Sequence, residues 1–133
     1  MTGLAHRGRA GRIESTDYPR QGVAVLKLVG EFDIATVPRV TEQLGQLPLA
    51  RLQHVVFDLQ GVSFLSASGV RMLVTTFAES GHTSTQVHLV GLTDDEQLQR
   101  MLSLLHMPRH LRQHATVHDA LHELDQEANN ERG

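Results

Sequence analysis

Ten residues decide how this chain folds: Phe64-Leu65-Ser66-Ala67-Ser68-Gly69-Val70-Arg71-Met72-Leu73. They follow an apolar run that is typical of a strand, Val55-Val56-Phe57 with Leu59. They lead into the i, i+3, i+4, i+7 spacing of one helix face, at Val70, Leu73, Val74 and Phe77. The stretch is therefore predicted to join the end of a strand to the start of a helix, with the rest of the chain as its scaffold.

Two serines, Ser66 and Ser68, fall at this predicted helix start. Small hydroxyl side chains at such a position can accept hydrogen bonds from the first backbone amides of the helix, which have no partner within the helix. The same amides and the helix dipole stabilise negative charge. The helix start is therefore predicted to accommodate a phosphate.

Strands and helices are predicted to alternate along the remainder of the chain. The predicted strands are Ile13–Asp17, Val23–Val29, Val55–Leu59, Val87–Val90 and Leu111–His114. Besides the helix after Ser66, helices are predicted to follow caps at Thr36, at the capping box Thr93-Asp94-Asp95-Glu96 and at Thr116. Pro48, Ser80-Gly81 and Pro108 are predicted to end the first three helices.

This alternation predicts an α/β fold with a mainly parallel sheet, right-handed crossovers and about four helices packed against the sheet. Pro19 and Gly22 favour a hairpin between the first two strands, which makes that pair antiparallel. With 133 residues, of which 40% are hydrophobic, the chain is expected to form one domain. We expect a flexible tail at residues 1–12, the domain at 13–124 and a polar tail at 125–133.

Composition excludes several classes of function. The formal charge is −3, so nucleic acid is not an expected partner, although protonation of all nine histidines would change the charge to +6. There is no cysteine, and no apolar run is long enough to cross a membrane. Lys27 is the only lysine, so there is no phosphate-binding loop ending in Gly-Lys-Ser/Thr. We expect a cytoplasmic protein without a cofactor and without membrane contact.

Three separated segments resemble the STAS domain of bacterial anti-sigma factor antagonists: Val29–Thr36, Val55–Phe64, and Ser66–Val70 with Leu73. The resemblance extends roughly from Ile13 to Leu124 and implies a STAS-like fold. In that family the serine directly before the glycine is phosphorylated, and here that serine is Ser68. The resemblance implies that the partner is an anti-sigma factor with ATP-dependent serine kinase activity, which releases a sigma factor when the antagonist binds. It also implies a serine phosphatase that restores the unphosphorylated form.

A phosphate on Ser68 would add about −1.5 to −2 charges to a small, partly apolar surface. A desolvated interface cannot accommodate such a charge unpaired, so binding is expected to be lost without refolding. Asp33 matches a family aspartate near the phosphorylated serine, although it is equally compatible with a plain turn residue. The predicted partner-binding residues are Asp33, Ser66, Ala67, Ser68, Gly69, Val70 and Arg71.

Two positions depart from the family pattern. Ser66 replaces the usual aspartate two residues before the phosphorylated serine, and Arg71 replaces the usual small residue three positions after it. Both changes make the site less acidic. Loss of the carboxylate is expected to weaken recognition by a standard kinase, and Arg71 lies one helical turn beyond Ser68, where it can pair with a phosphate or extend into solvent.

Several alternatives remain open. Ser66 and Ser68 can be caps only, and the domain can be a STAS module of another assembly, such as a stressosome or a lipid-transport complex. A serine hydrolase is disfavoured because the leading glycine of Gly-x-Ser-x-Gly is missing. A receiver-like domain with Asp58 as phospho-acceptor would need a lysine at the end of the last strand, and that lysine is absent.

Histidines recur at every fourth position from His106 to His122. On one unbroken helix they would form a row of metal ligands. Pro108 and the predicted strand at Leu111–His114 interrupt that helix, which leaves only His118 and His122 on a common face. No metal site is expected, and His118 and His122 are predicted to lie on the solvated surface.

Overall fold

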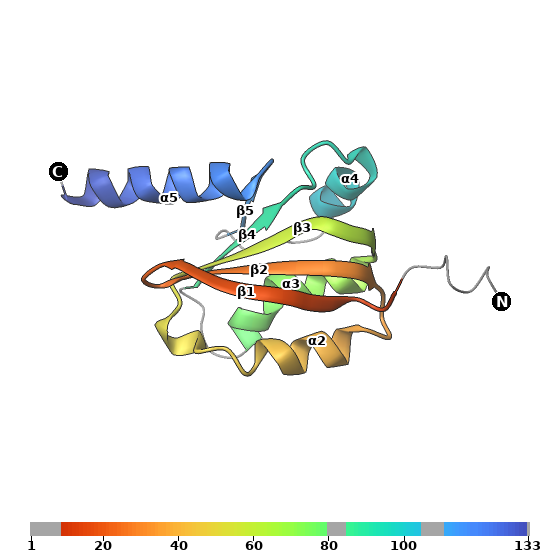
Figure 1. Cartoon of the computed structure of the whole chain (residues 1–133). Helices are drawn as coiled ribbons and strands as arrows, with labels where there is room; N and C mark the ends of the chain where they lie inside the picture. Colours follow the sequence, from red (N-terminus) through yellow and green to blue (C-terminus); the bar gives the residue numbers. More distant parts are fainter. Residues whose placement is uncertain (1–8, 80–84, 105–110, 133) are drawn as a thin grey trace.

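A computed structural model describes residues 9–79, 85–104 and 111–132. Strands and helices alternate along these residues as predicted (Figure 1). The strands are β1 (Arg12–Arg20), β2 (Val23–Phe32), β3 (His54–Leu65), β4 (Gln86–Val90) and β5 (Leu111–His114). The helices are α2 (Val37–Leu44), α3 (Ala67–Glu79), α4 (Glu96–Leu104) and α5 (Val117–Arg132), with a short 3-10 turn η1 (Leu49–Arg51) before β3.

The five described strands form one sheet in the order β1-β2-β3-β4-β5. β1 and β2 are antiparallel and are joined by a turn in which Gly22 has a φ of 77°, a conformation that favours glycine. The β2–β3, β3–β4 and β4–β5 pairs are all parallel. The predicted α/β class, with one antiparallel hairpin on a parallel sheet, is confirmed.

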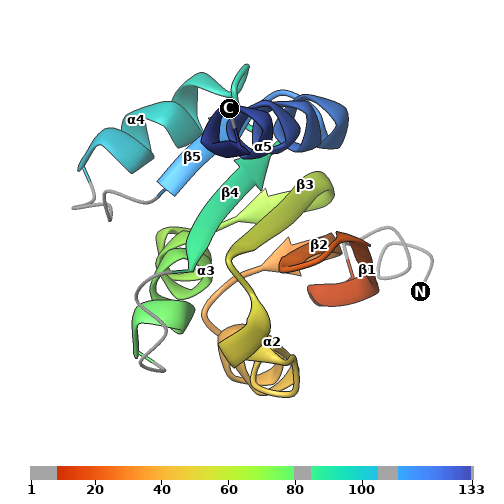
Figure 2. The ribbon, with the colours of Figure 1, turned by 90° about the vertical axis from the view of Figure 1, so that its left-hand side faces the viewer.

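Helices pack on both faces of the sheet, with α2, α3 and α4 on one face and α5 on the other. The main core lies between one face and helices α2, α3 and α4, and its members include Leu26, Phe32, Phe57, Leu73 and Leu89. Helix α5 covers the opposite face, where a second, smaller core consists of Val25, Val56, Val90 and Ala120. Figure 2 shows α5 on one side of the sheet and α2 and α3 on the other. Helix α5 therefore packs on a smaller apolar cluster than the one that α2, α3 and α4 share.

The described parts of the two predicted tails, residues 9–12 and 125–132, are attached to the folded domain. Ala10 forms a bridge with Glu31, and the amide of Gly11 donates to the Glu31 carbonyl at 2.7 Å, so residues 9–12 are attached to the end of β2. At the other end α5 continues through residues 125–132. Ion pairs explain that extension, because Arg20 bonds to Asp125 and Arg112 bonds to Glu127.

The helix caps agree with prediction in two of four cases. The Thr116 hydroxyl accepts from the amide of Asp119 at 3.0 Å, and Ser66 caps α3 as described below. Thr36 stands at the N-cap of α2 but makes no side-chain capping bond, because its hydroxyl bonds to the backbone of Asp33 instead. The prediction of Thr93 as a cap is wrong, since Asp95 accepts from the amide of Leu98 at 3.0 Å. The predicted helix ends at Ser80-Gly81 and Pro108 lie outside the described residues.

The receiver-like alternative does not match this topology. Receiver-like sheets have the strand order 2-1-3-4-5, whereas this sheet keeps its strands in sequence order and begins with an antiparallel pair. Asp58 is half-buried, and its carboxylate accepts from the amide of Gln60 at 3.1 Å. Asp58 therefore has a local structural role in β3.

Candidate partner-binding site at the start of helix α3

The ends of β2 and β3 hold the first turn of α3 in place. Phe32 and Leu65 pair as the last residues of the two strands, and the amide of Ser66 donates to the Phe32 carbonyl at 2.9 Å. A Cβ atom at Gly69 would lie 2.9 Å from that same carbonyl oxygen and 3.0 Å from Leu65 Cδ1. Only glycine lets the helix approach the strand end so closely. The chain thus fixes the position and direction of α3 within a few residues.

Ser66 is the N-cap of α3, as predicted. Its hydroxyl accepts from the amide of Gly69 at 3.1 Å, and its carbonyl accepts from the amide of Val70 at 3.0 Å. The hydroxyl of a capping residue satisfies an amide that the helix itself leaves without a partner. This bond occupies the Ser66 hydroxyl and leaves Ser68 as the exposed serine of the first turn.

Replacing Ser66 by alanine is expected to lower the free energy of unfolding by about 1 kcal/mol, the usual cost of losing an N-cap. Urea denaturation followed by circular dichroism would measure this. Ser63→Ala provides the control, because Ser63 is an exposed serine on β3 and should change stability by less than about 0.5 kcal/mol. Equal stability of the two variants would show that the capping bond contributes nothing.

Ser68 is the second residue of α3 and is exposed. Within the part of the chain that the structure describes, its hydroxyl has no hydrogen-bond partner. The hydroxyl is thus open to solvent on a rigid helix end. A phosphate added here would lie next to the free amides of the first helical turn, in the favourable field of the helix dipole.

Asp33 follows β2 at the same edge of the sheet. Its carboxylate accepts from the amides of Ala35 and Thr36 at 3.0 and 3.2 Å, so it organises the turn between β2 and α2. Because Phe32 pairs with Leu65, Asp33 and Ser66 follow directly on neighbouring strand ends. Asp33 is therefore a turn residue that also contributes charge at the edge where α3 begins.

Two of the predicted partner-binding residues are buried. Gly69 lies against the strand end, and the side chain of Val70 is fully buried in the main core. Their burial follows from the close approach of α3 to β2. Ala67, Ser68 and Arg71 are exposed, and within the described residues Arg71 forms no ion pair.

Two exposed apolar side chains extend this surface, and sequence reasoning missed both. Ile34 follows Asp33 and is 75% exposed, while Phe64 near the end of β3 is 52% exposed. Both residues lie near the paired ends of β2 and β3, and exposed apolar side chains at one edge of a domain are typical of sites of association. For Ile34, the available signal was an isoleucine inside a polar turn. For Phe64 the available signal was strand alternation, which places it on the face opposite to Leu65.

The described residues contain no cluster of histidine and carboxylate side chains able to hold a metal ion. His118 and His122 lie on the exposed face of α5 and stack with ring centroids 6.3 Å apart, which agrees with the predicted surface position. His106 and His110 lie outside the described residues. Over the same parts of the chain, no helix is long and apolar enough to cross a membrane.

The chain thus forms a small mixed α/β domain in which the start of one helix and the ends of two strands form one exposed surface. The family model of the STAS domain matches residues 17–120, and the chain belongs to that family. The resemblance seen in the sequence is thereby confirmed.

The relatives are named as regulators of sigma factors. The chain is 30% identical over 109 residues to the anti-sigma-F factor antagonist RsfB of Mycobacterium tuberculosis, covering 82% of this chain and 87% of the relative. An anti-sigma factor antagonist from Mycobacterium paratuberculosis has a similar structure, with a TM-score of 0.61 at 25% identity over 82% of this chain and 92% of that one. The anti-sigma factor antagonist SpoIIAA in its unphosphorylated form shares the fold, with a TM-score of 0.64 at 14% identity over 84% and 96%. These relatives are regulatory proteins rather than enzymes.

Proposed function

We propose that this protein is an anti-sigma factor antagonist whose binding to an anti-sigma factor is switched off by phosphorylation of Ser68. One observation carries the proposal: the exposed, unbonded hydroxyl of Ser68 lies at a capped helix start, at the same edge of the sheet as the exposed apolar side chains of Ile34 and Phe64. The apolar side chains supply binding energy, and the hydroxyl supplies a position where charge can be added. The names of the relatives support the class of partner.

The switch operates through charge at an interface. Phosphate at the helix start is stabilised by about 0.3–1 kcal/mol through the dipole, so the domain keeps its fold. The same phosphate adds about −1.5 to −2 charges where a partner must exclude water from Ile34 and Phe64. Asp33 at the same edge adds to the repulsion. Binding is therefore lost while the structure stays intact.

The proposed partner is an anti-sigma factor with ATP-dependent serine kinase activity, and a serine phosphatase reverses the modification in the cytoplasm. Ser66 in place of an aspartate removes one carboxylate from the surface that such a kinase recognises. Arg71, exposed and one turn beyond Ser68, is positioned on the helix to pair with the phosphate. Both residues adapt this site to a kinase that differs from those of typical family members.

The proposal is tested with ATP and the candidate anti-sigma kinases of the same genome. The expected result is one phosphate, mapped to Ser68 by mass spectrometry and absent from Ser68→Ala. Ser15→Ala is the matched control, since Ser15 is an exposed serine on β1, and it should be modified normally. If no cognate kinase modifies or binds the protein, partner switching is refuted and a STAS module of another assembly becomes the better description.

The positions of three histidines argue against another alternative, a serine hydrolase. In such an enzyme a histidine must lie within hydrogen-bond reach of the nucleophile. His54, His88 and His114 instead bond to one another on the sheet face that α5 covers. We expect no ester hydrolysis that depends on Ser68.

A further inference from the structure

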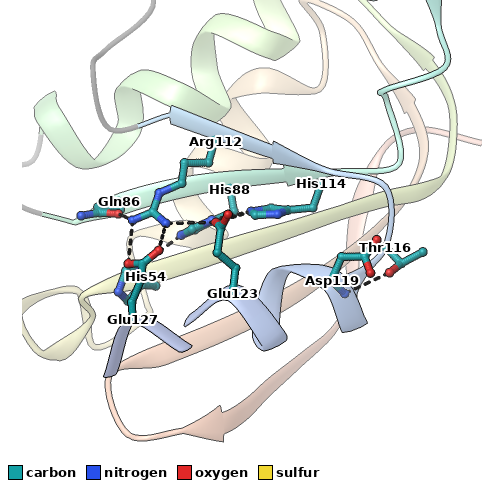
Figure 3. Close-up of polar contacts among 9 residues, drawn as sticks. All are labelled: His54, Gln86, His88, Arg112, His114, Thr116, Asp119, Glu123 and Glu127. Carbon is teal, nitrogen blue, oxygen red and sulfur yellow. Dashed lines mark hydrogen bonds and ion pairs between the residues drawn. The ribbon is translucent and has the colours of Figure 1, made fainter. Parts of the chain in front are cut away.

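Three histidines from three neighbouring strands form a continuous row beneath α5 (Figure 3). His54 Nδ1 lies 3.1 Å from His88 Nε2, and His88 Nδ1 lies 3.0 Å from His114 Nε2. His88, in the middle, is fully buried, His114 is buried and His54 is half-buried. The register of the sheet creates the row, because Val56 pairs with His88 and His88 pairs with Arg112, while His54 and His114 lie two residues away on the same face.

The two hydrogen bonds of the row depend on how many protons the three imidazole rings carry. A neutral imidazole donates from one nitrogen and accepts at the other, so three neutral rings can form both bonds in either direction. A protonated ring donates from both nitrogens. If neighbouring rings are both protonated, N–H groups face each other, the shared bond is lost and two charges repel each other. The row is therefore stable only while most of its rings are neutral.

The groups around the row come from the two flanking strands and from α5. From β5, Arg112 bonds to Gln86 of β4 and to Glu123 and Glu127 of α5. His114 Nε2 lies 3.8 Å from Glu123 Oε2, and the charges of Glu127 and Glu131 act on His54. The positive charge of Arg112 opposes protonation of the row, whereas the carboxylates of Glu123, Glu127 and Glu131 favour protonation. Together with the Arg20–Asp125 ion pair from β1, these contacts are the polar attachment of α5 to the sheet, beside the small core at Ala120.

We propose that the row His54-His88-His114 is a pH-sensitive latch that keeps α5 docked on the sheet at neutral pH and releases it in acid. Release would expose the apolar face of α5 and the small core beneath it. It would also open the cavity of about 620 Å³ at the hairpin end of the sheet, which His54, Glu127 and the turn at Gly22 line. This device is independent of Ser68, which lies at the other end of β2 and β3.

The direction of the pH effect follows from the protonation of the histidines when α5 is docked and when it is released. Burial, with the charges of His54, His114 and Arg112, lowers the pKa of His88 to about 3, and burial also lowers the pKa of His54. Once α5 is released, water reaches His54 and His88, and the pKa values of these two residues return toward about 6.5. Between these values the released form binds more protons, so the docked form loses stability as the pH falls. The ratio of released to docked molecules should rise about tenfold per pH unit below 6.5 for His88 alone.

Spin labels can test this directly, because the chain contains no cysteine. Gln21→Cys and Asn130→Cys place labels at two exposed positions, one on the hairpin turn and one on α5. Between pH 7.5 and 5.0 the short-distance population should decrease, while circular dichroism shows that the sheet stays folded. In the same background His88→Leu should remove the pH dependence. His118→Leu, a surface histidine of α5, should retain it.

A constant short-distance population down to pH 5.0 would overturn the latch. So would a loss of that population that coincides with unfolding of the whole domain, or a pH dependence that His88→Leu leaves unchanged. If His88→Leu does not fold, His54→Gln replaces it, since that variant removes only the half-buried end of the row and should shift the release to lower pH. An unshifted release in His54→Gln would equally refute the proposal.

Discussion

Replacing Ser68 by glutamate is expected to weaken binding to the anti-sigma factor at least about 30-fold, because an unpaired charge in a desolvated interface costs roughly 2–5 kcal/mol. The melting temperature should change by only a few degrees, since an acidic side chain at a helix start is tolerated. Isothermal titration calorimetry with the partner and thermal denaturation of the variant measure the two effects separately.

Ser15→Glu is the control for this prediction, because it adds the same charge at an exposed serine of β1, away from the start of α3. It should bind the partner normally. A large loss of stability in Ser68→Glu would identify Ser68 as a structural residue. Unchanged affinity would show that the partner binds another surface.

Phe32→Ala and Phe64→Ala should have opposite consequences, although both residues lie at strand ends of the same edge. Phe32 is fully buried, and its removal should lower the free energy of unfolding by about 3–5 kcal/mol. Phe64 is 52% exposed, and its removal should change stability little. As an aromatic anchor of the proposed surface it should instead contribute about 2 kcal/mol to partner binding, or roughly 30-fold in affinity.

Urea denaturation and calorimetric titration of the two variants would check this pair, and each variant serves as the control of the other. Loss of affinity in Phe64→Ala without loss of stability supports the surface at Ile34 and Phe64. If Phe64→Ala binds normally, the apolar residues at this edge do not contact the partner. If it unfolds as readily as Phe32→Ala, then its role is structural.

Much of the site could be predicted from short-range patterns. The strand-to-helix transition, the Ser66 cap and the exposed Ser68 depend on residues within a few positions of one another, where spacing and side-chain chemistry decide the outcome. These three features involve no knowledge of how distant residues pair. The place of Asp33 near Ser66 was implied by the family resemblance, and it depends on the pairing of β2 with β3.

The mispredicted features all depend on pairing and packing. Two register shifts place an extra residue in β3, one between Asp58 and Gly61 and one between Val62 and Phe64. Each shift turns the following side chains to the other face. Val62 consequently packs on the same core as Leu59 and Leu65. Simple alternation places Leu65 inside and Phe64 outside, because the two shifts cancel, but it does not place Val62 in the core.

The sequence by itself determined the α/β class, the hairpin, the capped start of α3 and the place of Ser68, because local propensities and spacing control these. Only the tertiary structure decided that Val62 packs in the core, that Ile34 is exposed, and that His54, His88 and His114 form one row. The reason is physical: burial and long-range contacts depend on strand register, and register is set by the packing of the whole sheet rather than by any one segment.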